Sequence, residues 1–498
     1  MKARIIFVLL FGLLIAGSCD LQEQPYGFYS ADNFYKTPND ARSSLLYAYD
    51  ALTYLEYSRT VFYLGDLPTD EVSPKSDEGA DAQQLSNWKV NSFKTNHLLE
   101  NFFHYAYIAI NRANAVIKHV PDAKFDQADK DKFVGEAYFL RAFNYFNLVR
   151  NFGKVPMHKS VVQTLDETTA PPAKNLDEVY SLIISDCKEA IKRLKIDPML
   201  GRTDKVAAQS LLAKVYLTIA SAKEHNVPLY KDMSEDVNKM YDKSAQYARD
   251  VVEKQSQYHF DDNLLHIYDV DSPHAPENIF LMSMDRSGES EGDYSKIGKL
   301  FIPYVDGATL YLSDHDGTFT KTHDGWSVLQ TNTPFYNSFG SSDKRKTQLM
   351  VDTVYTADGN VSATYPGSIL YPFSRKYVDP HFIGDKESTK PFLIRYSDIA
   401  LVLAEAVGPT QEGYKQVNYI RNRAGLGNLQ PNMSKADFRK AVLRERKWEL
   451  AFEGNRLYDL KRFNMVTDMV PEASSLSDKQ VAFYPIPQTE IDLNQGLQ

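Results

Sequence analysis

The sequence predicts a mainly α-helical fold that carries one long irregular segment, and three observations support this prediction. Apolar residues recur at every third and fourth position in the first half of the chain, for example between Leu99 and Ile117. Helical spacing returns beyond residue 392. Between about residues 256 and 392 it disappears, and Gly, Ser, Asp, Pro and Tyr become frequent. This pattern indicates a helical scaffold that supports a loop-rich region.

The periodicity places helices at about residues 38–57, 99–117, 130–150, 177–195, 205–222, 238–254, 396–407, 411–424 and 435–453. Consecutive pairs early in the chain resemble the helix-turn-helix units of tetratricopeptide repeats, although no full consensus of about 34 residues is present. We therefore expect residues 41–255 to form a tetratricopeptide-repeat-like scaffold that stacks into a curved solenoid. Residues 393–498 would add a C-terminal helical region and a tail.

Residues 1–18 have the composition of a secretory signal peptide. Basic residues precede an apolar run from Ile5 to Ile15, and small residues lead directly to Cys19. The run is too short to span a bilayer, which needs about 20 residues. Small residues before a cysteine resemble a lipobox, in which the cysteine is acylated and becomes the first mature residue. The sequence thus predicts lipidation of Cys19 and a tether over residues 19–40. Ordinary signal cleavage beside an incidental cysteine is the alternative.

Charge and cysteine content narrow the class of protein further. The formal net charge is -9, and no basic block follows Cys19, which argues against a nucleic-acid ligand. No later apolar stretch approaches transmembrane length, so membrane attachment would depend on lipid. The second cysteine, Cys187, falls in the apolar stripe of the helix predicted at 177–195, where we expect a small buried hydrophobe. Acylation of Cys19 would leave Cys187 without a disulfide partner. The exported chain must therefore be stabilised by its core.

The strongest internal pattern lies in residues 434–462. Ser434 starts a helix in the manner of a capping box, and Gly454 is expected to end it. Glu445 and Glu449 lie almost on the apolar face of this helix. Because an unpaired buried charge is costly, we predict an ion-pair network between these carboxylates and the abundant arginines. A pair of catalytic acids is the alternative interpretation.

This segment resembles the C-terminal signature of the SusD/RagB family, the surface nutrient-binding lipoproteins that work beside TonB-dependent outer-membrane transporters. Further blocks resemble the family in the same order: Gly135–Phe146, Phe152–Pro156, Arg202–Ala208, Arg395–Asp398, Leu403–Ala406, Asn418–Ala424 and Tyr484–Pro487. The resemblance covers nearly the whole chain after Cys19. It implies a tetratricopeptide-like scaffold that carries a variable, loop-rich ligand surface. The acidic loop Asp66–Glu71 also resembles a family loop, and its role stays open.

Aromatic residues in polar loops are the candidate ligand-binding residues. Trp88 and Trp326 lie in polar, irregular surroundings, and Tyr304 belongs to the same irregular segment as Trp326. An aromatic ring offers a flat apolar face to a sugar, while Asn and Asp bond its hydroxyl groups. In starch-binding relatives Trp and Tyr on corresponding loops contact the glycan, and the resemblance implies such a role for Trp88 together with Asn91. The alternative for Trp88 is packing against the scaffold.

Catalytic and metal-binding patterns are weak. Gly288–Gly292 matches Gly-x-Ser-x-Gly around Ser290, but the helix that must follow a nucleophile elbow is not indicated. Asp314–Gly317 hints at calcium, although Gly325 stands where an EF-hand loop needs Glu. No His-Glu-x-x-His pair or clear zinc spacing is present. We predict no cofactor, and a structural calcium is a secondary hypothesis.

These observations and the family resemblance together predict a non-enzymatic, surface-exposed lipoprotein of the outer membrane. It would bind an oligosaccharide on the irregular region 256–392 and deliver it to a SusC-like TonB-dependent transporter. A peptide as the ligand of the same scaffold is the nearest alternative. A secreted hydrolase is a more distant one.

Overall fold

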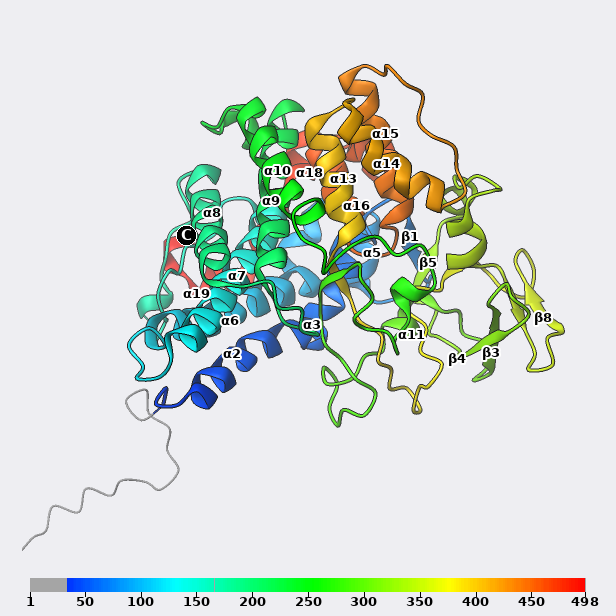
Figure 1. Cartoon of the computed structure of the whole chain (residues 1–498), viewed down its shortest axis with the longest axis horizontal. Coiled ribbons are helices and arrows are strands. Elements are labelled where there is room, and N and C mark those ends of the chain that lie inside the picture. The colour runs from blue at the N-terminus through cyan, green and yellow to red at the C-terminus, as the bar shows by residue number, and fades with distance from the viewer. Residues whose placement is uncertain (1–33, 165, 498) are drawn as a thin grey trace, which may run out of the picture.

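The protein is described by a computed structural model that covers residues 34–164 and 166–497. The predicted signal peptide, Cys19 and most of the predicted tether lie outside the described residues. Figure 1 shows the longer helices stacked beside one another, with the sheet built from residues 309–364 at the opposite end of the molecule. Within the described part of the chain, no helix combines the length and the apolar character needed to cross a membrane.

The longer helices form the scaffold and pack in chain order. They are α2 (Pro38–Thr53), α6 (His97–His119), α7 (Gln127–Phe152), α8 (Leu176–Arg193), α9 (Lys205–Glu224), α10 (Val237–Val252), α13 (Tyr396–Val407), α14 (Gln411–Arg423) and α15 (Lys435–Glu449). Helix α6 packs on α7, α7 on α8, α8 on α9 and α9 on α10, and α10 continues onto α13. The stack therefore crosses the irregular region without interruption, and the mainly helical, tetratricopeptide-like fold is confirmed.

Short helices and strands fill the connections. The short helices are α3 (Leu55–Ser58), α4 (Thr60–Gly65), α5 (Ala80–Ser86), α11 (Ile297–Phe301), α12 (Thr333–Asn337), α16 (Arg456–Arg462), α17 (Val466–Met469), α18 (Asp478–Ala482) and α19 (Gln488–Leu493). The strands are β1 (Val72–Pro74), β2 (Asn278–Leu281), β3 (Thr309–Ser313), β4 (Phe319–His323), β5 (Leu329–Thr331), β6 (Met350–Val351), β7 (Thr353–Tyr355), β8 (Val361–Thr364), β9 (Phe373–Ser374) and β10 (Phe392–Arg395). They pair antiparallel as β4-β3-β7-β8, β1-β5, β2-β10 and β6-β9.

Polar side chains at the residue directly before each helix fix where most scaffold helices begin. Asn96 accepts hydrogen bonds from the N–H groups of Leu98 and Leu99 at the start of α6. The same function is served by Asp126, Asn175, Asp204, Asp236, Thr410 and Ser434 at α7, α8, α9, α10, α14 and α15. Such caps satisfy N–H groups that have no partner inside the helix. Sequence-local signals therefore set most helix boundaries.

Two predicted helices end earlier than expected. The predicted helix 38–57 breaks at Tyr54, whose extended backbone (φ −51°, ψ 137°) separates α2 from α3. The predicted helix 435–453 stops at Glu449, and the chain then turns through left-handed conformations at Phe452 and Gly454. Because this turn faces inward, its N–H groups need buried acceptors. The acidic loop described below supplies them.

The predicted ion-pair network around Glu445 and Glu449 is present and buried. Glu445 accepts from Arg345 at 2.7 Å and from Arg421 at 3.0 Å. Glu449 accepts from Arg395 at 2.9 Å and from Arg423 at 2.7 Å. These partners come from the irregular region, from β10 and from α14. The carboxylates therefore join three separate parts of the chain, as the ion-pair interpretation predicts.

The acidic loop Asp66–Glu71 holds the turn that follows α15. Both carboxylate oxygens of Asp66 accept from the Gly454 N–H at 3.0 Å, and Glu71 accepts from the Phe452 N–H at 3.3 Å. Asp70 forms a two-pronged pair with Arg456 at 2.7 and 3.0 Å. The role that the sequence leaves open for this loop is thus structural.

Burial of two of these acids makes the stability of the fold depend on pH. Desolvation raises the pKa of the Glu71 carboxyl to about 8, against the opposing effect of Arg456, and raises that of Asp66 well above its usual value. Between about pH 5 and 8 the unfolded chain has lost the Glu71 proton, whereas the folded chain still holds it. Unfolding then releases a proton, so rising pH favours the unfolded state.

We expect Glu71→Gln to weaken this pH dependence. Gln keeps the shape and an acceptor for the Phe452 N–H but cannot ionise. In urea titrations the free energy of unfolding of the native protein should fall between about pH 5 and 8, with Glu71 contributing about 1–3 kcal/mol. The variant should show a shallower decline. Identical slopes for the two proteins would contradict the assignment of a neutral Glu71.

Candidate functional site

The loop that carries Trp326 is fixed by backbone hydrogen bonds on each side of the ring. The N–H of Trp326 donates to the Lys299 carbonyl at 2.7 Å, and the N–H of Gly325 donates to the Pro303 carbonyl at 2.9 Å. A Cβ at Gly325 would lie 1.8 Å from the Ile302 oxygen, so only glycine permits this close approach. The indole is thus presented by a rigid loop and stays partly exposed.

Glu387 anchors the segment beneath this loop. Its buried carboxylate accepts from the N–H groups of Gly298 at 2.8 Å and Lys299 at 3.2 Å, at the start of α11. The Nε2 atom of His323, at the end of β4, lies 2.8 Å from the same carboxylate. One carboxylate therefore connects α11, β4 and the 387–390 segment. This connection keeps the Trp326 loop in place without any contribution from a ligand.

Tyr304 lies beside Trp326, as its position in the same irregular region suggests. Its N–H donates to the Ser327 hydroxyl at 2.9 Å, and its side chain is 63% exposed. The phenol donates to Asp306 at 3.3 Å. The structure therefore brings two of the predicted ligand-binding residues together on one accessible surface.

Cationic side chains also surround Trp326, and they form what we term the cation–aromatic row. Arg59, between α3 and α4, lies 5.5 Å from the centre of the Trp326 ring. Lys296 lies 5.8 Å from that centre and 5.6 Å from the centre of the Tyr294 ring. Lys386 lies 4.9 Å from the Tyr294 ring. Cations and aromatic rings thus alternate along this surface, and all five side chains are partly exposed.

The prediction that Trp88 binds the ligand is wrong, because this side chain belongs to the core. Its side chain is 3% exposed, and its indole N–H donates to the Pro68 carbonyl at 3.1 Å. The ring stacks on Tyr484 of the C-terminal tail, with centres 6.1 Å apart, and meets the edge of Phe93. No face of this ring is left for a sugar. Packing against the scaffold, the alternative stated for Trp88, is what the structure shows.

Asn91 is exposed on the short 3₁₀ helix Val90–Thr95. Its contribution to a site was implied together with the ring of Trp88, three residues earlier. Since that ring is buried, Asn91 has no aromatic partner from the Trp-x-x-Asn arrangement. We retain Trp326 and Tyr304 as the candidate ligand-binding residues and exclude Trp88.

Asp314, which the sequence suggests as a calcium ligand, is paired with an arginine in the structure. Asp314 lies in the turn between β3 and β4, where Arg375 pairs with its carboxylate. The hydroxyls of Thr318 and Thr320 donate to the same carboxylate at 3.0 and 2.7 Å. Within residues 34–164 and 166–497, no group of three or more His, Cys, Asp or Glu side chains is arranged to hold a metal ion. The donors expected for calcium are therefore engaged in other bonds.

Ser290 lacks the surroundings of a catalytic nucleophile. It is exposed in a turn, and its N–H donates to the Asp293 carboxylate at 3.1 Å. The next helix, α11, begins only at Ile297. A nucleophile elbow needs a helix directly after the serine and a base within hydrogen-bond reach. The described contacts of Ser290 include no histidine.

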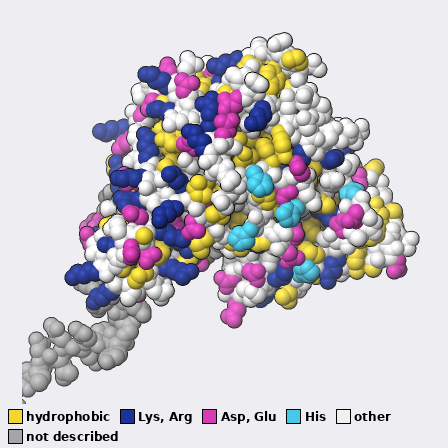
Figure 2. All heavy atoms as spheres, viewed as in Figure 1, with side chains coloured by type: hydrophobic (Ala, Val, Ile, Leu, Met, Phe, Trp, Pro, Cys, Tyr) yellow, Lys and Arg dark blue, Asp and Glu magenta, His cyan; other side chains and the backbone are white. Residues whose placement is uncertain are grey.

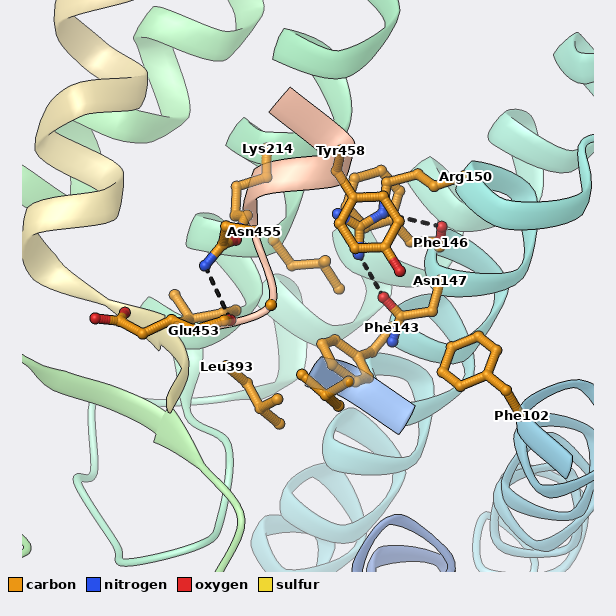
Figure 3. Close-up of a pocket in the computed structure, with 14 residues that line it drawn as sticks. Phe102, Phe143, Phe146, Asn147, Arg150, Lys214, Leu393, Glu453, Asn455 and Tyr458 are labelled. Carbon is orange, nitrogen blue, oxygen red and sulfur yellow. Dashed lines mark hydrogen bonds between the residues drawn. The ribbon is translucent and has the colours of Figure 1, made fainter. Parts of the chain in front are cut away.

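A small cavity lies between the scaffold and the segment after α15. It has a volume of about 40 Å³, enough for about three water molecules. Figure 3 shows Arg150 and Asn147 of α7 hydrogen-bonded to one another beside Tyr458, while Lys214 of α9 lies beside Asn455. The Arg150 guanidinium lies 3.8 Å from the centre of the Tyr458 ring. This cavity is too small for a sugar. It lies where α7 and α9 meet the segment that follows α15.

A larger open groove runs between α2 and the loops that follow α8 and β2. Its volume is about 540 Å³, and its wall includes Leu46, Tyr49, Met199, Phe280 and Asp285. Figure 2 shows one face of the molecule, where hydrophobic side chains form a band across the middle and Lys and Arg are most frequent over the helices at the left. The groove is a concave surface that a ligand could reach.

Sequence reasoning missed Arg59, Tyr294, Lys296 and Lys386. Arg59, Lys386 and the neighbouring pair Tyr294 and Lys296 come from three separate parts of the chain. Ser295 pairs with Glu387, and α4, which follows Arg59, contacts α11. Phe62 of α4 contacts the rings of Phe301 and Tyr377, each with centres 5.4 Å apart. No local sequence pattern around Arg59 predicts its contact with Trp326. The short spacing of Tyr294 and Lys296 is a local signal that could have indicated this surface.

The fold and the site define a helical-repeat protein that displays an aromatic surface on rigid loops. The chain belongs to the SusD/RagB family. The family model described as "SusD family" matches residues 276–481, and the model described as "Starch-binding associating with outer membrane" matches residues 40–217. Together the two matches cover most of the chain.

Individual relatives agree over nearly the full length. SusD-like protein P2 of Formosa agariphila is 26% identical, with 100% of this chain and 98% of the relative aligned. A solved laminarin-binding SusD-like protein is 23% identical, with a TM-score of 0.75 over 93% of this chain and 98% of its own. A SusD homologue from Bacteroides thetaiotaomicron is 21% identical, with a TM-score of 0.76 over 94% and 97%. The fold is therefore shared by the whole length of these proteins.

Proposed function

We propose that this protein binds an oligosaccharide on the surface around Trp326 and Tyr304, without chemical conversion. The rigid presentation of the Trp326 ring by the 299–303 segment is the observation that carries this proposal. Sugars bind such rings through their CH faces, and a ring fixed before binding loses little entropy on association. The surroundings of Ser290 support binding rather than hydrolysis. Family members are binding proteins, and the laminarin-binding relative has a carbohydrate ligand.

We further propose that Cys19 carries a lipid anchor at the outer membrane and that a SusC-like TonB-dependent transporter receives the ligand. The signal-peptide pattern before Cys19 supports the anchor. The family description "associating with outer membrane" supports the location. The mass of the amino-terminal peptide of the native protein tests the anchor, and co-purification from detergent extracts tests the transporter.

Trp326→Ala should weaken oligosaccharide binding at least fivefold. An indole that loses roughly 100 Å² of exposed surface to a bound sugar contributes about 2–3 kcal/mol, part of which is offset by ordering of the ligand. Affinity electrophoresis against a panel of polysaccharides would identify the glycan, and isothermal titration with its oligosaccharides would measure the loss.

Tyr47→Ala is the matched control, because Tyr47 is an exposed aromatic residue on α2, outside the proposed surface. This variant should bind the glycan as the native protein does. Unchanged affinity in Trp326→Ala, with native thermal stability, would remove Trp326 from the site.

A peptide ligand is the second candidate, and the groove beside α2 favours it. The groove combines apolar side chains such as Leu46 and Phe280 with polar groups that include Asp50 and Asp285. An extended peptide needs both kinds of contact over several residues. Binding to peptide mixtures, without retardation by any glycan, would replace the oligosaccharide in this proposal.

A further inference from the structure

The cation–aromatic row contains positive charges that the protein itself does not neutralise. Among the described residues, no carboxylate lies within ion-pair distance of the Arg59 guanidinium or the Lys386 ammonium. The Lys386 ammonium donates to the Gly288 carbonyl at 2.7 Å, which leaves further donors available. Lys296 differs from both, because it pairs with Glu291.

Buried arginines elsewhere in the fold have carboxylate partners, in contrast to Arg59. Arg345, Arg395 and Arg423 each contact two or more carboxylates. Arg59 is half-buried beside Trp326 and has none. A cation that loses water without gaining an anionic partner is left uncompensated. Such a site favours a ligand that brings a negative charge.

The acids nearest to Arg59 are engaged by other groups or lie too far away. Glu387 accepts the N–H groups at the start of α11 and contacts His323. Glu291 pairs with Lys296, and Glu56 forms no ion pair with Arg59. Burial lowers the pKa of the Arg59 guanidinium, and these acids only partly offset the effect. The guanidinium nevertheless stays charged at neutral pH.

We propose that the oligosaccharide is acidic, an inference that rests on the proposed function. Its sugar rings would stack on Trp326 and Tyr294, while Arg59 and Lys386 bind carboxylate or sulfate groups along the chain. Arginine binds such groups through two parallel hydrogen bonds, and lysine acts as a point charge. A glycan with negative charges on successive units would meet successive cations of the row.

Matched ligands test this proposal directly. Homogalacturonan oligosaccharides carry carboxylates, and their carboxyl-reduced forms are neutral with the same linkage. A sulfated galactan oligosaccharide and its desulfated form provide the sulfate arm. Titration calorimetry at low salt should show at least tenfold tighter binding of one acidic form than of its neutral partner, and that arm identifies the anion. The preference should shrink at high salt.

Charge-removing variants connect the preference to the row. Arg59→Gln and Lys386→Gln should each weaken binding of the acidic form roughly tenfold and of the neutral form less than twofold. Arg59→Lys should recover part of the loss, because it restores the charge without the paired donors. Lys440→Gln is the control, since Lys440 is an exposed lysine of α15 outside the surface. It should bind both forms as the native protein does.

The outcomes separate this inference from the proposed function. Equal affinity for acidic and neutral forms, or unchanged acidic binding in both Arg59→Gln and Lys386→Gln, would overturn the inference and leave glycan binding intact. Binding of no glycan in either form would overturn both. Lys386→Gln keeps the inference testable if Arg59→Gln disturbs the Trp326 loop, because Lys386 contacts Tyr294 instead.

Discussion

Replacing Arg395 by Met should lower the free energy of unfolding by about 3–5 kcal/mol, because it leaves buried carboxylates without a partner. Arg395 is 1% exposed and donates to Glu277 at 3.0 Å, to Glu449 at 2.9 Å and to Glu453 at 2.8 Å. It also donates to the backbone carbonyl of Glu449 at 2.6 Å. Methionine fills part of the volume but satisfies none of these acceptors. Chemical denaturation followed by circular dichroism would measure the change.

Arg249→Met is the matched control for burial. Arg249 also forms a two-pronged pair, with Glu412 at 2.6 and 2.8 Å, but the two side chains are 39% and 24% exposed. Water solvates the remaining carboxylate after the substitution, so we expect a loss below about 1 kcal/mol. Equal losses in the two variants would show that the buried network contributes no more than a surface pair.

The scaffold was predictable because its signals are local. Helix α13 begins and ends where the apolar periodicity of residues 396–407 places it. Caps such as Ser434 mark the helix starts within one residue. The prediction extended α15 to residue 453 because the helical pattern of apolar residues continues past Glu449. The N–H groups of Phe452 and Gly454, just past the helix, instead donate to buried carboxylates. These carboxylates, Asp66 and Glu71, come from the other end of the chain.

The candidate site was only partly predictable, because its contacts are long-range. Trp326 and Tyr304 lie in one segment, and the sequence identified both. Trp88 misled the interpretation since its exposed neighbours, Asn87 and Lys89, gave it a polar context. A left-handed backbone at Trp88 (φ 48°) turns its ring inward, onto a tyrosine of the tail. Neither feature can be read from residues 86–91.

The acidic loop explains why the first and last parts of the chain form one unit. Its carboxylates bind backbone N–H groups and Arg456 beyond α15, and α4 lies directly before it. The same α4 supports the Trp326 surface through Phe62. Helix α4 therefore connects the acidic loop with the proposed ligand surface around Trp326.

The close contact between Gly65 and Gly454 predicts a second large effect on the free energy of unfolding. At the end of α4, Gly65 packs against the backbone of Gly454, and a Cβ on Gly65 would lie 2.3 Å from the Gly454 oxygen and 2.5 Å from its Cα. Gly65→Ala should thus force α4 and the turn after α15 apart and stretch the hydrogen bonds from the Gly454 N–H to Asp66. We expect a loss of about 2–4 kcal/mol in the free energy of unfolding.

Gly79→Ala is the matched control for this effect, because a Cβ at Gly79 would meet nothing within 4 Å. Its φ of −53° suits alanine, so the free energy of unfolding should change by less than about 0.5 kcal/mol. Since backbone atoms, not a flexible side chain, oppose the added methyl at Gly65, the turn after α15 has no easy way to relax. A Gly65→Ala protein as stable as Gly79→Ala would show that α4 and this turn can separate freely. The Trp326 surface, which α4 supports, would then need another source of rigidity.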